Sequence, residues 1–163
     1  MFPPNIIQPG DAIMYRPSSL VGVIIAIKTW SWTSHIEVYV GDNRSIGARE
    51  EGVDVWPVRN DKYAKTILRP KSEILNIAAG MEWFNEEAKG DKYDVEGLFG
   101  FFIPDKRPKD DSTVNYKKEF CSQLATMFYK RCGFNPFAPT YPARLISPAQ
   151  YYQSPLMDVV WEG

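Results

Sequence analysis

Short segments of alternating or wholly apolar residues, separated by turn residues, fill the N-terminal half of the chain. Such segments are typical of β-strands. They span 12–16, 35–40, 44–49, 52–58 and 65–69. The second and third flank a Gly-Asp-Asn turn and predict a hairpin. Together the segments predict an antiparallel sheet of about five strands.

Helical periodicity follows the sheet. Segment 74–89 carries an apolar stripe and ends at Gly90, and a longer C-terminal helix is predicted from 116 or 120 to 132. Shorter helices are predicted at 20–28, where a strand is the alternative, and at 148–152. Strands followed by helices are typical of an α+β fold in which helices pack against the sheet.

The composition narrows the class of protein. A chain of 163 residues predicts one domain spanning residues 1–163. The net charge of −1 argues against nucleic acid as a partner. The longest apolar run is too short for stable membrane insertion, and the N-terminus lacks the basic region of a signal peptide. We therefore expect a soluble protein that is cytoplasmic or released by lysis or a dedicated export route. The sequence leaves its oligomeric state open.

The two cysteines have different predicted roles. Cys121 and Cys132 lie on one predicted helix, about 16 Å apart, which is too far for a disulfide. With a single histidine they are also too few for an ordinary zinc site, so we expect no metal and no cofactor. Cys132 is at the helix C-terminus, where the dipole opposes a thiolate, and is predicted to be core. Cys121 is near the N-terminus, where the dipole favours a thiolate.

A thiol nucleophile needs a base, and the chain has one histidine, His35. It lies in a predicted strand, whereas Cys121 lies at a predicted helix start. A lone cysteine or strand histidine is more often structural than catalytic, but the two together are the minimum parts of a thiol hydrolase site. Side chains of His35 and Glu37 share one face of the strand, so Glu37 could orient the imidazole.

Five motifs, in the order found here, resemble the circularly permuted NlpC-like branch of papain-fold cysteine hydrolases, and its YiiX-like group in particular. They are Gly-Asp-Ala-Ile-Met-Tyr at 10–15, Ser-His-Ile-Glu-Val-Tyr-Val-Gly at 34–41, Gly-Asp-Lys-Tyr-Asp at 90–94, Phe-Cys-Ser-Gln-Leu at 120–124 and Ser-Pro at 147–148. In this branch the histidine strand precedes the cysteine helix, as it does here. The resemblance implies a permuted papain-like fold with the catalytic cysteine on a C-terminal helix.

The resemblance also implies an activity. Cys121 would be the nucleophile of a cysteine peptidase or amidase, and His35 its base and later its acid. The backbone N–H of Cys121 would stabilise the oxyanion, with Tyr15 and Ser122 as candidate substrate or oxyanion contacts. The implied substrate is an amide bond in a cell-wall peptide (peptidoglycan) or a related molecule.

One departure from the family pattern concerns the third catalytic residue. Relatives carry a polar residue on the strand after the histidine, and Gly47 stands there in this chain. Glu37, Glu50, a water or a backbone carbonyl could replace it. Otherwise the domain would be a non-catalytic binding module.

Two further alternatives concern the function. The first is a thiol acyltransferase or lipase acting on lipid acyl groups, although such relatives carry Asn-Cys-Glu-His-Phe at the nucleophile, which segment 120–124 does not match. The second is a host- or partner-interaction protein whose aromatic segment 134–155 forms an interface.

Overall fold

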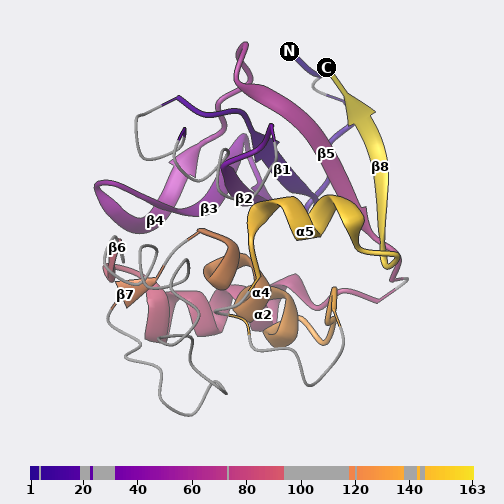
Figure 1. The fold of residues 1–163 in the computed structure, drawn as a ribbon. Coiled ribbons are helices and arrows are strands. Elements are labelled where there is room, and N and C mark those ends of the chain that lie inside the picture. Colours follow the sequence, from indigo (N-terminus) through magenta and orange to yellow (C-terminus); the bar gives the residue numbers. More distant parts are fainter. Residues whose placement is uncertain are drawn as a thin grey trace, which may run out of the picture.

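The sheet dominates the fold (Figure 1). The computed structural model describes residues 1–3, 5–18, 23, 32–72, 74–93, 118–119, 121–137, 143 and 146–163. Its strands are β1 (Ala12–Tyr15), β2 (His35–Gly41), β3 (Arg44–Arg49), β4 (Gly52–Pro57), β5 (Ala64–Pro70) and β8 (Met157–Glu162). They form one sheet in the order β4-β3-β2-β1-β5-β8, and every neighbouring pair is antiparallel. The predicted α+β class is thus confirmed in general terms.

The helices lie against this sheet. They are α2 (Ile77–Trp83), which continues as a π-helical turn η1 (Phe84–Ala88), then α4 (Cys121–Arg131) and α5 (Pro148–Gln153). Two short strands, β6 (Lys92–Tyr93) and β7 (Lys118–Glu119), pair in parallel. None of the helices formed by the described residues is both long and apolar enough to cross a membrane.

The five strands predicted from the sequence correspond to β1 to β5. The sixth strand, β8, was not predicted, and it extends the sheet at the edge beyond β5. The helix predicted from residue 74 starts at Ile77, because the Asn76 side chain accepts a hydrogen bond from the Ala79 N–H (3.1 Å) and caps it there. The helix or strand predicted at 20–28 lies outside the described residues, except for position 23.

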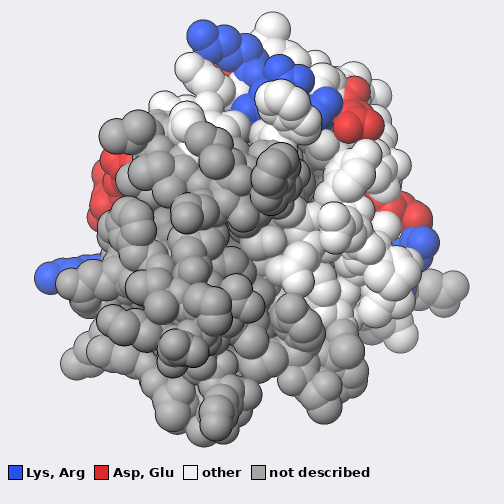
Figure 2. Space-filling model, viewed as in Figure 1, with Lys and Arg blue, Asp and Glu red and all other residues white. Residues whose placement is uncertain are grey.

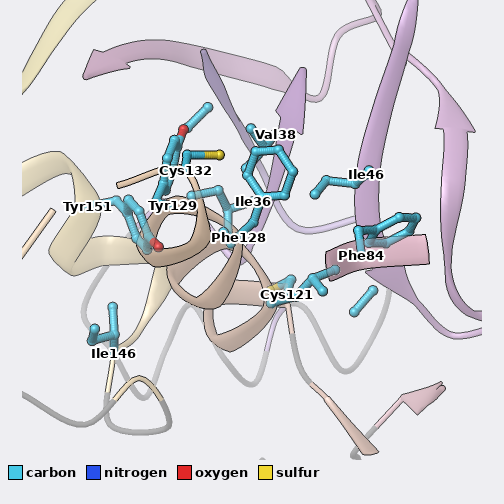
Figure 3. Packing of buried hydrophobic residues seen from close by; sticks show 14 of the residues in the cluster. Ile36, Val38, Ile46, Phe84, Cys121, Phe128, Tyr129, Cys132, Ile146 and Tyr151 are labelled. Carbon is cyan, nitrogen blue, oxygen red and sulfur yellow. The ribbon is translucent and has the colours of Figure 1, made fainter. Parts of the chain in front are cut away.

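Alternation along the strands divides the apolar residues between the two faces of the sheet. Ala12 and Met14 of β1 belong to a cluster with α2, α4 and α5, whereas Ile13 and Tyr15 pack with Phe2 on the other face. Figure 3 shows the helix side of this core, where aromatic side chains meet the apolar residues of β2 and β3. Its labelled members are Ile36, Val38, Ile46, Phe84, Cys121, Phe128, Tyr129, Cys132, Ile146 and Tyr151.

A buried ion pair fixes the start of β1. Asp11 is 1% exposed, and its two carboxylate oxygens accept hydrogen bonds from the Arg69 guanidinium on β5, both at 2.8 Å. The preceding residue, Gly10, has φ of 96°, and its carbonyl accepts a hydrogen bond from the Tyr129 hydroxyl of α4 (2.9 Å). The Gly-Asp motif therefore joins β1 to both β5 and α4.

Helix α2 approaches α4 closely at Gly80. A Cβ atom built there would clash with Cys132 Sγ and lie 2.8 Å from the Phe128 ring. Cys132 is 1% exposed, and burial raises its pKa to about 11, against a weaker opposing hydrogen bond from the Gly80 backbone. The prediction that Cys132 is a core residue is confirmed.

This contact predicts that Gly80→Ala destabilises the protein. Helix propensity alone would stabilise the variant by about 1 kcal/mol. We expect a net loss of about 1–3 kcal/mol in the free energy of unfolding, because overpacking at Cys132 and Phe128 outweighs that gain. Urea denaturation measures the change. Adding Cys132→Ala should recover part of the loss, while Ala78→Gly on the exposed side of α2 reports propensity alone. A more stable Gly80→Ala variant would contradict the prediction.

Candidate active site

Cys121 is the first residue of α4, as the sequence predicted for a helix-start thiol. It is 3% exposed and belongs to the core cluster beneath β2 and β3. The dipole of α4 and its free N–H groups favour negative charge at this end.

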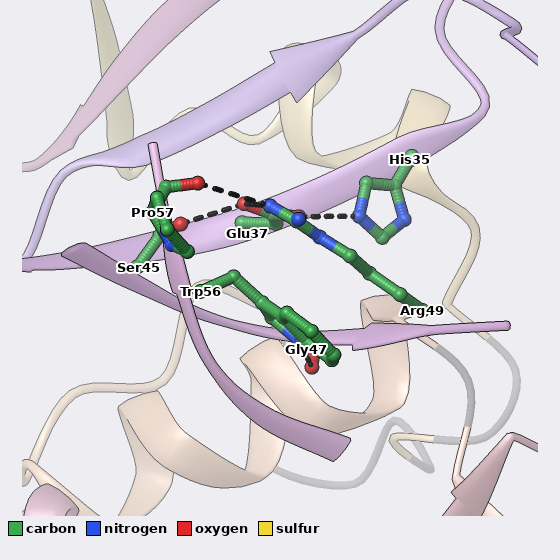
Figure 4. Close-up of polar contacts among 7 residues, drawn as sticks. All are labelled: His35, Glu37, Ser45, Gly47, Arg49, Trp56 and Pro57. Carbon is green, nitrogen blue, oxygen red and sulfur yellow. Dashed lines mark hydrogen bonds and ion pairs between the residues drawn. The ribbon is translucent and has the colours of Figure 1, made fainter. Parts of the chain in front are cut away.

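The structure brings Cys121 and His35 together. His35 is the first residue of β2 and pairs with Tyr15 of β1. Its imidazole is hydrogen-bonded to the Cys121 thiol and, through Nε2, to Glu37 Oε1 at 2.9 Å. Because Nε2 faces Glu37, Nδ1 is the nitrogen left for the sulfur. Figure 4 shows this second ring nitrogen pointing away from Glu37.

Glu37 is a buried carboxylate whose two oxygens both have donors. Besides His35, Oε1 accepts from Arg49 Nε (2.7 Å), and Oε2 accepts from Arg49 Nη2 (3.0 Å) and Ser45 Oγ (2.6 Å). Burial alone would raise the pKa of Glu37, but the hydrogen bonds and charges of His35 and Arg49 lower it to about 2. Glu37 is therefore ionised across the physiological range.

The charges around His35 favour its protonated form. Burial alone would lower its pKa, but the charge and hydrogen bond of Cys121, followed by those of Glu37, raise the pKa to about 9. The protonated imidazolium, hydrogen-bonded to the Glu37 carboxylate, is therefore the favoured form of His35.

Glu37 occupies the space that a side chain at position 47 would need. The β2–β3 register pairs Val38 with Ile46, and its continuation places Gly47 opposite Glu37. A Cβ on Gly47 would lie 2.8 Å from Glu37 Cγ and 3.1 Å from Oε1. Of the candidates to orient His35, Glu37 makes the hydrogen bond, whereas Glu50 lies exposed in the turn after β3.

Arg49 and Trp56 complete this network, and the sequence interpretation missed both. The Arg49 guanidinium lies over the Trp56 ring, with Cζ 4.9 Å from the ring centroid. The Trp56 Nε1–H donates to the Gly47 carbonyl (3.0 Å), and Arg49 Nη2 donates to the Pro57 carbonyl (3.3 Å). Residues 45, 47 and 49 alternate onto one face of β3, and this spacing was the available signal.

The two other predicted site residues have distinct surroundings. The Tyr15 ring is fully buried, with its centroid 5.8 Å from that of the His35 imidazole. The Ser122 hydroxyl donates to the Ile146 carbonyl (2.5 Å) and is buried, so it joins α4 to the segment before α5. A role for Ser122 as a substrate or oxyanion contact stays a prediction. Among the described residues, no group of three or more His, Cys, Asp or Glu side chains could hold a metal ion.

The single histidine makes the network measurable. We predict that Gly47→Ala pushes Glu37 out of hydrogen-bonding position and lowers the pKa of His35 from about 9 toward its ordinary value of 6.5. NMR titration of the imidazole resonances reports this directly, because no other histidine contributes to the spectrum. Gly133→Ala is a control for a destabilising glycine substitution outside the network: its φ of 82° strains an alanine, but a Cβ there meets open space and no part of Glu37. An unchanged titration in Gly47→Ala would contradict the assignment of Glu37.

Acid should remove the contribution of Glu37 to stability. Its pKa falls from 4.5 in the unfolded chain to about 2 in the folded protein, so the ionised form stabilises the fold above pH 4.5. We predict that this stabilisation is lost as the pH falls from 4.5 to about 2. His35 adds no slope in this range, because it is protonated in both states. The measurement is the difference in free energy of unfolding between wild type and Glu37→Gln, which should shrink with acid. A difference that stays constant would contradict the prediction.

Comparison with known proteins adds no relative. No protein-family model matches this chain, and no curated protein sequence matches it significantly. Interpretation of the site therefore rests on its own contacts: the pairing of Cys121 with His35 and the hydrogen bond from His35 to Glu37. Kinship with the permuted NlpC-like hydrolases stays a prediction from the motifs.

Proposed function

We propose that this protein is a cysteine hydrolase that cleaves an amide bond through Cys121 and His35, on a permuted papain-like fold. The observation that carries the proposal is the continuous chain of contacts from thiol to imidazole to carboxylate. Each member has the position its role needs. The nucleophile stands at a helix N-terminus, the base has one nitrogen toward the sulfur, and the carboxylate holds the other.

The reaction follows from this geometry. The Cys121 thiolate attacks the amide carbonyl, and the backbone N–H at the start of α4 stabilises the oxyanion. The His35 imidazolium then gives its proton to the leaving nitrogen as the C–N bond breaks, which leaves a thioester on Cys121. Water, deprotonated by His35, hydrolyses the thioester and releases the acid. Throughout, Glu37 fixes the orientation of the ring and stabilises its charge.

The substrate class comes from the motif resemblance, which favours a cell-wall peptide or a related amide. A thiol acyltransferase or lipase would use the same first step, with an amine or alcohol rather than water accepting the acyl group. Gly47 suggested a non-catalytic binding module, because glycine has no side chain to orient the imidazole. The hydrogen bond from Glu37 to His35 orients the imidazole instead. An interface at 134–155 has little support, because Phe134 and Tyr151 are core residues and Tyr152 is the one large apolar side chain exposed among the described residues there.

The first test is the reactivity of the thiol. We predict that iodoacetamide alkylates Cys121 at about pH 6 at least ~tenfold faster than free cysteine, which is mostly protonated there. Mass spectrometry of the labelled peptide identifies the residue, and Cys132, whose pKa burial raises to about 11, should remain unlabelled. Glu37→Gln should slow the labelling, since it removes a charge that favours the imidazolium. Cys121 reacting no faster than free cysteine would count against activation.

The second test is turnover. Purified protein is incubated with peptidoglycan fragments and with libraries of acyl amides, with and without an added amine. We expect hydrolysis that Cys121→Ala abolishes and Cys132→Ala leaves intact. Glu37→Gln should lower kcat by about 10²-fold or more, because the base loses its orienting partner. Acyl transfer to the amine in preference to water would favour the transferase alternative, and activity that survives Cys121→Ala would refute the proposal.

A further inference from the structure

A second arginine lies beside the candidate site. Arg59 follows β4, and its guanidinium stacks on Tyr15, with Cζ 4.8 Å from the ring centroid. The Tyr15 ring in turn lies 5.8 Å from the His35 imidazole, centroid to centroid. The Tyr15 ring thus lies between the His35 imidazole and the Arg59 guanidinium. The two groups are separated by a distance of about two or three residues of extended chain.

Arg59 and Tyr15 each have a buried donor that no acceptor among the described residues receives. Arg59 Nε and the Tyr15 hydroxyl are both inaccessible to solvent, and the Tyr15 oxygen interacts with the backbone of Arg59, which leaves its O–H without an acceptor. Burial and the nearby charge of Glu37 raise the pKa of Tyr15, so its hydroxyl remains a donor. Buried donors without acceptors are rare in native proteins, and two on side chains that stack on each other indicate a place for an acceptor from outside.

The neighbouring arginine shows the contrast. Arg49 donates hydrogen bonds to Glu37 and to the Pro57 carbonyl, so the positive charge of Arg49 is neutralised by a carboxylate within the fold. Arg59 makes no ion pair with any described residue and remains partly exposed. Glu37 pairs with both His35 and Arg49, so Arg59 adds a positive charge that no carboxylate of the described residues compensates.

Lys and Arg atoms gather at the top of the face shown in Figure 2, with Asp and Glu atoms beside them. Lys65, for example, pairs with Glu162 at 3.4 Å. In Figure 1 this is the end of the molecule where β4 connects to β5 and where both chain termini lie. Arg59 is in that connection.

We propose that Arg59, together with the Tyr15 hydroxyl, binds a carboxylate of the substrate, so that the amide cleaved is one whose leaving portion carries a carboxylate. The inference rests on the proposed function, because it uses the role of His35. The leaving nitrogen must lie against His35 to receive its proton, and Arg59 lies on that side of the site across Tyr15. A guanidinium with free N–H groups is well suited to a carboxylate.

A matched pair of alkylating probes tests this without knowledge of the substrate. N-iodoacetylglycine and its carboxamide differ only in the charge at the end of the probe. With each, the Cys121 sulfur displaces iodide and forms a C–S bond, and the rate constants are read by mass spectrometry. We expect the wild type to react about five- to tenfold faster with the carboxylate than with the carboxamide, corrected for the rates with free cysteine.

Variants separate the contribution of Arg59 from general electrostatics. Arg59→Met keeps an unbranched side chain beside Tyr15 but removes the guanidinium and its charge, and it should bring the carboxylate-to-carboxamide ratio to about one, with little change for the carboxamide. Arg44→Met removes an exposed charge at the start of β3 and should leave the ratio intact. A wild-type ratio of one, or a ratio that survives Arg59→Met, overturns the carboxylate site. Slow reaction of Cys121 with both probes would instead count against the proposed function.

Discussion

A buried, ionised carboxylate is stable only if each of its oxygens accepts hydrogen bonds. Glu37 meets that condition through four hydrogen bonds. The donors come from β2 itself and from Ser45 and Arg49 on β3. Arg49 is in turn held by β4 through Trp56 and the Pro57 carbonyl. A slip of one residue between β2 and β3 would turn Ser45 and Arg49 to the other face and leave the carboxylate unpaired. The register of three strands and the ionisation of Glu37 therefore depend on each other.

The same condition explains how a glycine can stand where related proteins are expected to have a polar residue. The space above Gly47 is filled by Glu37, which reaches the His35 ring from two residues away on the same strand. A larger residue at position 47 and the present conformation of Glu37 exclude each other. Glu37 of β2 makes the hydrogen bond to the imidazole, and Gly47 of β3 leaves the space that the Glu37 side chain occupies.

Elements with strong local signals could be predicted from the sequence. Alternation bounded by turns gave β1 to β5 nearly to the residue, and the last glycine of the main helix gave its end. β8 was missed because Met157 is its one buried residue, so at the sheet edge it lacks a clear apolar face. The pairing of His35 with Cys121 followed from one histidine and one helix-start cysteine. Arg49, Trp56 and Arg59 could not be found in this way, because their contacts depend on register and on distances across strands.

Arg49 and Arg59 illustrate how the surroundings decide what a residue can do. Both guanidiniums stack on an aromatic ring, at 4.9 and 4.8 Å, and both flank the same histidine. Arg49 is compensated by Glu37, so its charge is used to keep that carboxylate ionised and His35 in place. Arg59 has no such carboxylate among the described residues, and its buried Nε is unpaired. Since an arginine cannot shed its proton to relieve burial, an uncompensated one persists most readily where an anion completes it during function. Arg49 thus serves the His35–Glu37 network, whereas Arg59 has donors left for an anion from outside the chain.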